Sequence, residues 1–339
     1  MKQIALIAPF TFQFNEIEIP TIKENEVLLK INQIGICASD MQMYHGQHKY
    51  MKFPIVFGHE VAATIVEVGK QVNDYKIGDR VTVEPQVFCG ECYPCKTGHF
   101  NVCQNLRVLG VHKDGFACEY FAIEPKYLHN CNELTDDQTA MMEPLAVGIS
   151  SARRGNVAGK NVAIVGSGII GNLVAQSAIA QGAEKVLITD IKDSKLEFAR
   201  KAGIEYTFNT SNKSLKDAIN DIFGYRKADV IIDCAANKAS FNSIIEAARP
   251  RSTIVITGNY KTPVEFEVPL VQRQEIDLIG HMMYQREDFA DGIRYIKEGI
   301  IKIDSFATQH NNISTVAESF DFIDKNPDLV MKSMLMMDN

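Results

Sequence analysis

A glycine-rich turn between an apolar strand and an alanine-rich helix constrains the fold of this chain more than any other feature. Gly166, Gly168 and Gly171 form the pattern G-x-G-x-x-G. A β-branched segment, 161–165, precedes the turn, and residues 173–181, which contain neither Pro nor Gly, follow it. The sequence therefore predicts a strand, a tight turn and a helix in succession. A turn of this kind that binds no ligand is the alternative.

The next segment makes the dinucleotide interpretation specific. Residues 186–189 predict a second strand, and Asp190 follows it, 19 residues after Gly171. In a dinucleotide-binding βαβ unit the glycines let the backbone approach the diphosphate, the helix N-terminus offers N–H groups, and an acidic residue binds the adenosine ribose. A carboxylate there favours NAD over NADP, although Lys192 and Lys195 are nearby cations. The predicted cofactor-binding residues are Gly166, Gly168, Ile169, Ile170, Gly171, Asp190 and Lys195.

The remaining pattern predicts an α/β protein of two domains. Strands at 229–233, 253–257 and 277–279 alternate with helical stretches, which predicts a doubly wound parallel sheet over 149–284. Residues 1–148 instead carry short strands broken by Gly and Pro, which indicates a β-rich domain of barrel type. We expect the tail, 285–339, with its closing strand near 331–336, to return to this first domain.

Composition excludes several classes of protein. The net charge is −7, with 46% hydrophobic and 23% charged residues, which argues against disorder and against a basic nucleic-acid platform. The most apolar run, 162–183, is interrupted by glycines and polar residues, so no membrane span is expected. The N-terminus lacks the apolar region and cleavage site of an export signal, which predicts a cytoplasmic protein.

Four of the eight cysteines crowd into one short segment. Cys89, Cys92, Cys95 and Cys103 are spaced C-x2-C-x2-C-x7-C. Turn residues in the gaps allow the sulfurs to face one centre, as in a structural zinc site with four thiolates. An iron–sulfur cluster is the competing metal site, although its cysteine runs have a shorter last step and a following Pro. Four free cysteines are the remaining alternative.

A second set of ligand-type residues is scattered along the chain. Cys37, His59, Glu60 and Glu143 lie in the segments GICASD, FGHEV and MMEPLAV. Thiolate, imidazole and carboxylate are zinc ligands, and three of them with an open position define a catalytic site. Their separation in the sequence makes this a weak prediction from spacing alone.

The order of the motifs adds a resemblance that covers essentially the whole chain. GICASD, FGHE, CGECYPCKTGHFNVC, DGFACEY, EPLAVG and GSGIIG resemble the zinc-dependent medium-chain dehydrogenase/reductase family, closest to its sorbitol, threonine and sugar-acid dehydrogenases. The resemblance implies a GroES-like catalytic domain, a Rossmann domain for NAD, and two zinc ions per chain. It also implies a homodimer or homotetramer.

The same resemblance assigns roles near the second metal site. Cys37 and His59 would bind the catalytic zinc, together with Glu60 or with a water held by Glu143. Asp40 would orient the zinc-binding histidine, and Ser39 would take the proton of the substrate alcohol. Tyr44 and His45 could extend the proton relay or line the pocket.

The expected reaction is oxidation of a secondary alcohol in a polyol or sugar acid, with hydride passing to nicotinamide C4. Arg107 and His112 are candidates for binding a substrate carboxylate, although a surface role for each is the simpler expectation. L-threonine and vicinal diols such as butanediol are the rival substrates. A non-catalytic NAD-binding protein and a quinone or enone reductase are alternatives that the intact zinc motifs and Asp190 disfavour.

Overall fold

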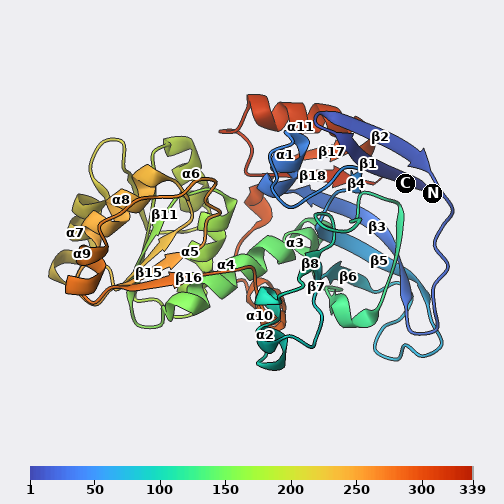
Figure 1. Cartoon of the computed structure of the whole chain (residues 1–339), viewed down its shortest axis with the longest axis horizontal. Coiled ribbons are helices and arrows are strands. Elements are labelled where there is room, and N and C mark those ends of the chain that lie inside the picture. Colours follow the sequence, from blue (N-terminus) through green and yellow to red (C-terminus); the bar gives the residue numbers. More distant parts are fainter. Residues whose placement is uncertain (338–339) are drawn as a thin grey trace. The chain divides into compact units, whose positions relative to one another are not determined.

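The computed structural model describes residues 1–337, which divide into two compact units (Figure 1). The first unit contains residues 1–143 and the described residues from Ala307 onward, and the second contains Pro144–Phe306. Within residues 1–337, no helix is both long enough and apolar enough to cross a bilayer.

A seven-stranded sheet forms the centre of the first unit. Its path is β10-β6-β5-β3-β18-β17, and β9 pairs with β3 outside that path. The strands are β3 (Val27–Ile36), β5 (Glu60–Val68), β6 (Arg80–Val83), β9 (Tyr120–Ile123), β10 (Leu128–Asn130), β17 (Ala307–Asn312) and β18 (Lys332–Met336). The sheet confirms the β-rich first domain.

The strand β3 lies inside this sheet, between β5 and β18. Most of its residues are buried, on both faces of the sheet. It pairs antiparallel with β5, with Gly35 opposite Glu60, and antiparallel with β18, with Gly35 opposite Met334. The closing strand predicted near 331–336 is thus β18, and it returns to the first unit as expected. One end of β3 therefore joins segments from the start, the middle and the end of that unit's sequence.

Short elements complete the first unit. One further sheet has the order β2-β1-β4, and β7 pairs with β8. These strands are β1 (Lys2–Ala8), β2 (Thr11–Glu16), β4 (Ile55–Val56), β7 (Gln86–Val87) and β8 (Arg107–Val108). The α-helices are α1 (Ala38–Tyr44), α2 (Tyr93–Lys96), α3 (Asp136–Ala140) and α11 (Val316–Lys325). The 3-10 turns are η1 (Phe100–Val102), η2 (Pro125–Tyr127) and η5 (Ile313–Thr315).

The second unit contains a six-stranded parallel sheet with the order β13-β12-β11-β14-β15-β16. Its strands are β11 (Asn161–Val165), β12 (Lys185–Asp190), β13 (Tyr206–Asn209), β14 (Val230–Asp233), β15 (Thr253–Ile256) and β16 (Asp277–Gly280). The strand order reverses between β11 and β14, which is the topological switch point of a doubly wound fold. This confirms the predicted Rossmann-type sheet.

Helices cover both faces of the parallel sheet. Successive side chains of a strand point to opposite faces, so Ala163 and Val165 pack in one apolar layer while Val162 and Ile164 pack in the other. The α-helices of this unit are α4 (Met142–Gly155), α5 (Ile169–Ala180), α6 (Asp193–Lys201), α7 (Leu215–Phe223), α8 (Lys238–Ala247), α9 (Val268–Arg273) and α10 (Arg286–Lys297). The 3-10 turns are η3 (Gly224–Arg226) and η4 (Asp304–Phe306).

The unit boundary differs from the expected one. The sequence suggested that the chain leaves the nucleotide-binding domain at 285, whereas the second unit extends to Phe306 and so includes α10. Arg153 explains this difference, because its guanidinium lies 3.1 Å from Asp288 and 2.6 Å from Asp291. Phe289, on the same helix, is fully buried. These contacts attach α10 to α4, and no sequence pattern signals them.

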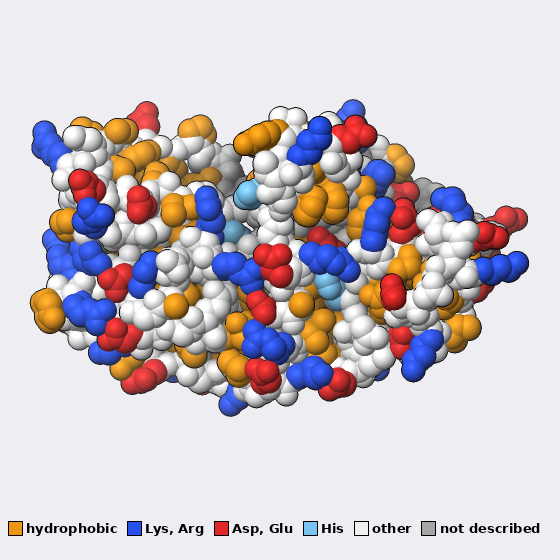
Figure 2. Space-filling model, turned by 90° about the horizontal axis from the view of Figure 1, so that it is seen from below, with side chains coloured by type: hydrophobic (Ala, Val, Ile, Leu, Met, Phe, Trp, Pro, Cys, Tyr) orange, Lys and Arg blue, Asp and Glu red, His pale blue; other side chains and the backbone are white. Residues whose placement is uncertain are grey.

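Charges of both signs are interspersed on the face drawn in Figure 2, where lysine and arginine side chains alternate with aspartate and glutamate side chains. A surface of this kind creates no extended field of one sign. This agrees with the small net charge of −7 for the whole chain.

Candidate metal centres and nucleotide-binding turn

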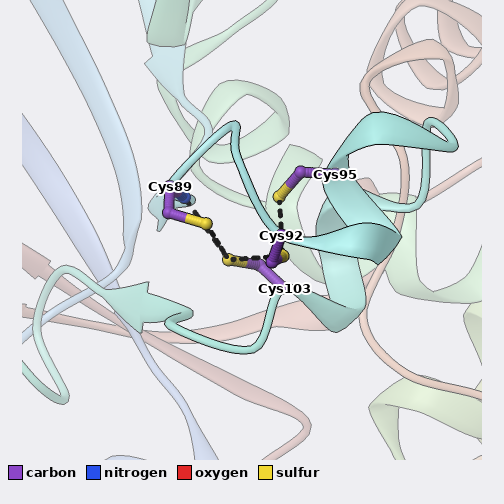
Figure 3. Close-up of side chains that lie close together, drawn as sticks. All are labelled: Cys89, Cys92, Cys95 and Cys103. Atoms are coloured by element: carbon purple, nitrogen blue, oxygen red, sulfur yellow. Dashed lines mark hydrogen bonds between the residues drawn. The ribbon is translucent and has the colours of Figure 1, made fainter.

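The four clustered cysteines converge on one point (Figure 3). Cys92 caps the short helix α2, Cys95 lies within it, Cys103 follows the turn η1, and Cys89 lies on the loop before them. One ligand atom from each lies within 4.8 Å of all the others. The local turns alone therefore bring the four sulfurs together, as the spacing predicts.

The sulfur–sulfur distances fit a metal rather than disulfides. Cys92 Sγ lies 3.4 Å from Cys95 Sγ and 3.8 Å from Cys103 Sγ, which in turn lies 3.5 Å from Cys89 Sγ. A disulfide needs about 2.05 Å. In a tetrahedral site with Zn–S bonds of about 2.3 Å the sulfurs are about 3.8 Å apart. A zinc ion fits here with all four positions occupied by protein.

Backbone N–H groups donate hydrogen bonds to the cysteine sulfurs and so stabilise their thiolate form. Cys89 N and Asn105 N both donate to Cys103 Sγ at 3.3 Å. Hydrogen bonds from the backbone at Glu91 and Cys92 lower the pKa of Cys89 to about 6, whereas burial raises the pKa of Cys95 to about 12. Such donors stabilise the charged sulfur that a metal requires.

The second candidate centre lies where β3 ends and β5 begins. Cys37 follows β3 and caps α1, while His59 and Glu60 mark the start of β5. One ligand atom from each of the three lies within 4.8 Å of the others. The three residues are too far apart in the sequence to be predicted as a set from spacing, and the pairing of β3 with β5 is what brings them together. Thiolate, imidazole and carboxylate form a donor set that fits zinc and leaves a position open.

The imidazole of His59 is held by its neighbours on α1. Its Nδ1 lies 3.5 Å from Asp40 Oδ1, and its Nε2 lies 3.4 Å from Ser39 Oγ. The other Asp40 oxygen, Oδ2, accepts a hydrogen bond from Cys37 N at 2.8 Å. Asp40 therefore ties the histidine to the loop of the cysteine and leaves Nε2 on the side of Ser39.

The electrostatics of this pair reflect its burial. Asp40 is 1% exposed and His59 is 5% exposed. Burial works to lower the pKa of His59, but the Asp40 carboxylate and the Cys37 side chain outweigh it and raise that pKa well above its usual range. For the acid Asp40, burial has the opposite sign and raises the pKa. A buried site with this much negative potential attracts a cation.

Glu60 has a partner that the sequence interpretation missed. The Nζ of Lys332, on β18, lies 2.7 Å from each carboxylate oxygen of Glu60 and donates to Ile36 O at 3.3 Å. Both side chains are almost fully buried. One signal was available, because Lys332 is a lone cation in the apolar run MKSMLMM. A lysine in such a strand needs a buried acid, although nothing local identifies which one.

Three other predicted residues are placed differently with respect to the trio. Glu143, in the first turn of α4, is buried and raises the pKa of both His59 and Lys332, but it is not among the three ligand atoms that lie together. Tyr44 donates to Asp321 at 2.9 Å, and His45 Nε2 lies 2.6 Å from Asp324. Both side chains thus face α11.

The glycine turn adopts the geometry of a nucleotide-binding loop. Gly166 has φ +101°, which favours glycine, and a Cβ on Gly171 would lie 1.8 Å from Gly166 O. Nothing lies within 4 Å of a Cβ built on Gly168, which caps α5. The first and third glycines thus shape the turn, and open space beside the second fits a diphosphate at the helix N-terminus.

Asp190 is already bonded to this turn. Its Oδ2 accepts from Ser167 N at 2.7 Å, and its Oδ1 accepts from Lys192 N at 3.0 Å. Ser167, which the sequence interpretation did not single out, donates to Lys195 O at 3.1 Å. Lys195 therefore joins the turn through its backbone. Ile169 and Ile170 form the first turn of α5 and are partly buried.

The two folds and the sites that they carry define a zinc-dependent dehydrogenase with a GroES-like unit and a nucleotide-binding unit. Two family models match the chain: the alcohol dehydrogenase GroES-like domain over residues 23–133, and the zinc-binding dehydrogenase domain over residues 170–298. The chain belongs to the family of zinc-binding alcohol dehydrogenases. Its assignment as an oxidoreductase of this family, with zinc and a nicotinamide dinucleotide, is confirmed.

Individual relatives of the chain include dehydrogenases of sugar acids and polyols. The chain is 32% identical to L-galactonate-5-dehydrogenase of Escherichia coli K12, covering 90% of this chain and 89% of the relative. It is 30% identical to sorbitol dehydrogenase of Bacillus subtilis, covering 93% of each. A solved structure of an alcohol dehydrogenase of E. coli CFT073 with NADH superimposes with a TM-score of 0.91 at 30% identity, covering 99% of each chain.

Proposed function

We propose that this chain oxidises a secondary alcohol of a polyol or sugar acid to the ketone and passes the hydride to nicotinamide C4 of NAD. The convergence of Cys37, His59 and Glu60 supports this most strongly, because the set has three zinc-type donors and one open position. When bound, zinc supplies Lewis-acid chemistry and NAD accepts the hydride.

The protein residues then have separate roles. Cys37 and His59 hold the metal, and Asp40 fixes the orientation of the His59 ring through Nδ1. Ser39, whose Oγ lies 3.4 Å from His59 Nε2, would relay the proton of the substrate hydroxyl: its Oγ accepts that proton while its own hydroxyl proton passes to solvent. Either Glu60 would complete the donor set directly, or Glu143 would hold a water in its place. The four clustered cysteines hold a second, structural zinc.

Arg107 and His112 offer few charges for a substrate carboxylate, because both side chains are exposed. Burial and the neighbouring His112 and His59 lower the pKa of His48, and partial burial and the neighbouring Arg107 lower the pKa of His112. Lowered pKa values leave both imidazoles neutral near pH 7, so they would supply hydrogen bonds and not a positive charge. The aldonate class is therefore supported by the similarity to L-galactonate-5-dehydrogenase and not by these side chains.

The cofactor and the assembly complete the proposal. Asp190 favours NAD because its carboxylate, beside the glycine turn, would accept hydrogen bonds from a ribose diol and repel a 2′-phosphate. We expect a cytoplasmic homodimer or homotetramer, which light scattering of the purified chain measures. A monomer in solution would contradict that expectation.

A substrate panel tests the reaction. NADH formation by the zinc-loaded protein is followed with aldonic acids, polyols, L-threonine, vicinal diols and primary alcohols, each with NAD and with NADP. We expect activity with aldonates or polyols and NAD. Activity confined to L-threonine or butanediol would keep the chemistry and refute the substrate class. No activity with two zinc ions bound would refute the enzymatic proposal.

A pair of cysteine variants tests the metal assignment. Cys37→Ser is expected to lower bound zinc from two ions to one per chain and to abolish turnover. Cys131→Ser, which changes a buried cysteine outside both clusters, is expected to keep both ions. Full turnover by Cys37→Ser would remove Cys37 from the catalytic centre.

A further inference from the structure

A buried carboxylate lies at the end of the parallel sheet where the strand order reverses. Asp233 is the last residue of β14, pairs in register with Val165 on β11, and is 0% exposed. Val165 is the residue directly before the glycine turn. Nucleotides bind at this edge of doubly wound sheets. A fully buried acid here needs partners for both of its oxygens.

Both oxygens of Asp233 are satisfied by loops that follow neighbouring strands. Oδ1 accepts from Ala235 N at 3.1 Å and from Ala236 N at 3.2 Å. Oδ2 accepts from the hydroxyl of Tyr260, which comes from the loop after β15. Burial raises the pKa of Tyr260, so its hydroxyl is protonated and donates. The aspartate therefore joins the segment 234–236 to the loop of Tyr260.

The segment 234–236 packs directly on the glycine turn. A Cβ on Gly166 would lie 3.0 Å from Ala235 N and 3.2 Å from Ala235 Cβ, so the two backbones touch with no room for a side chain. Ala236 has φ +52°, a conformation that alanine rarely adopts. The contacts with Asp233 hold that conformation in place. Displacement of the segment would open the turn on this side.

Tyr260 is itself held by aromatic packing. Its ring makes an edge contact with Phe241 of α8 at a centroid distance of 6.2 Å, and Phe241 packs against Phe266 at 5.3 Å. The hydroxyl is thereby directed at Asp233 from a fixed ring. A fixed donor costs less entropy to use than a mobile one, so the hydrogen bond can position the segment firmly.

We propose that Tyr260 and Asp233 are positioning residues for the dinucleotide: their buried hydrogen bond holds residues 234–236 against Gly166, so that the glycine turn is preformed for the diphosphate. This inference rests on the proposed cofactor site at that turn. It assigns no contact between Tyr260 and the cofactor. It predicts that loss of the tyrosine hydroxyl weakens dinucleotide binding without affecting either zinc site.

Tyr260→Phe tests the proposal through direct binding. The chain contains no tryptophan, so the fluorescence of NADH can be titrated without interference from indole. We expect the Kd of NADH to rise about ten- to hundredfold, as for the loss of one hydrogen bond to a buried charged group. The affinity of ADP-ribose, measured by its displacement of NADH, should fall by the same factor, because ADP-ribose contains the diphosphate but not the nicotinamide. Zinc content, kcat and the KM of the alcohol should stay unchanged, while the KM of NAD rises.

Matched variants make the result decisive. Tyr225→Phe removes a hydroxyl from a side chain that is 94% exposed in the same unit, and it should bind NADH as the parent does. Asp233→Asn keeps an acceptor for the segment and should retain more affinity than Asp233→Ala. If Tyr260→Phe lowers only thermal stability and keeps the parental Kd, the positioning role is wrong. If the parent itself fails to bind NADH while holding both zinc ions, the proposed cofactor site fails, and this inference fails with it.

Discussion

Lys332 Nζ lies 2.7 Å from both carboxylate oxygens of Glu60, and neither side chain is more than 2% exposed. A third contact, to Ile36 O at 3.3 Å, accounts for the remaining donor of the ammonium. Burial works to lower the pKa of Lys332, but Glu60, Cys37 and Glu143 together outweigh that effect and raise the pKa, so the lysine stays charged. A candidate metal ligand is thus already neutralised by the protein, and a metal at this site has to compete with Lys332 for Glu60.

Replacement of Lys332 is expected to be costly. Lys332→Met leaves Glu60 buried without its cation, and removing one partner of a buried pair typically costs about 3–5 kcal/mol. Urea unfolding of the zinc-depleted protein measures the loss. The double variant Lys332→Met with Glu60→Gln should recover much of it, because no unpaired charge is then left inside.

An exposed ion pair provides the control for that experiment. Lys126 lies 3.0 Å from Glu124, and its side chain is 58% exposed. Lys126→Met should change stability by less than about 0.5 kcal/mol. Equal losses for Lys126→Met and Lys332→Met would contradict a special role for the buried pair.

Gly35 provides the space that Glu60 occupies. A Cβ at this position would lie 2.1 Å from Glu60 Oε2, so Gly35→Ala forces the carboxylate away from Lys332. We expect a loss of about 1–3 kcal/mol in stability. The loss should shrink in a Glu60→Ala background, where only the Cβ contact remains. Gly280→Ala, at a strand position with open space, is the control and should have little effect on stability. If Gly35→Ala costs the same in the parent and in the Glu60→Ala background, Gly35 does not act through Glu60.

The cysteine lobe should bind zinc for stability. Cys95→Ser removes one of four converging sulfurs, and we expect one zinc ion fewer per chain and a lower melting temperature, with the remaining folded protein still able to turn over substrate. Cys118→Ser, in a buried cysteine elsewhere in the first unit, should keep the zinc content. Elemental analysis with thermal unfolding distinguishes them. A stable Cys95→Ser protein with full zinc would exclude the structural site.

Asp190 should set the choice of cofactor. Asp190→Ala removes the carboxylate and is expected to lower kcat/KM for NAD about ten- to hundredfold while NADP becomes a better substrate. Asp190→Asn keeps an acceptor for Ser167 N and separates the charge from the packing role. Asp193→Asn, on the neighbouring exposed helix turn, is the control. Unchanged discrimination between NAD and NADP in Asp190→Ala would refute the assignment.

His281 should make the second unit sensitive to acid. Burial lowers its pKa to about 4, below the unfolded value near 6.5. Because the unfolded state then binds the proton more strongly, this contribution to stability is complete above about pH 6.5 and is lost as the pH falls toward 4. At pH 5 the loss is about 1–2 kcal/mol.

The comparison is between the parent and His281→Gln at pH 7 and pH 5. The variant should lose less stability on acidification than the parent, as measured by urea unfolding at each pH. His99→Gln, at an exposed position, should follow the parent. A His281→Gln variant with the parental pH dependence would show that this imidazole does not titrate on unfolding.

The sites with ligands close together in the chain were predictable in detail. Cys89 to Cys103 span fifteen residues, and turns between them suffice to bring four sulfurs together. The glycine turn is equally local, because Gly166 and Gly171 meet within one strand–helix connection. Local turn chemistry and backbone sterics determine such sites, and both are written in consecutive residues.

The candidate metal site of Cys37, His59 and Glu60 shows the intermediate case. His59 and Glu60 are adjacent, but Cys37 reaches them only because β3 pairs with β5. The motif order suggested the set through family resemblance, whereas spacing alone left it weak. The extension of the second unit to Phe306 also depends on residues that are far apart in the sequence. Arg153 contacts α10 across more than a hundred residues of chain.

The sequence by itself determined the cysteine cluster, the nucleotide turn and the succession of a β-rich segment and a doubly wound one. Only the tertiary structure decided that Lys332, 272 residues away in the chain, neutralises Glu60. The physical reason is strand register: β18 pairs with β3 and β3 pairs with β5. A shift of one residue in either pairing would place Lys332 and Glu60 on opposite faces of the sheet. Periodicity reveals that a strand is buried, but it carries no information on which distant strand lies beside it.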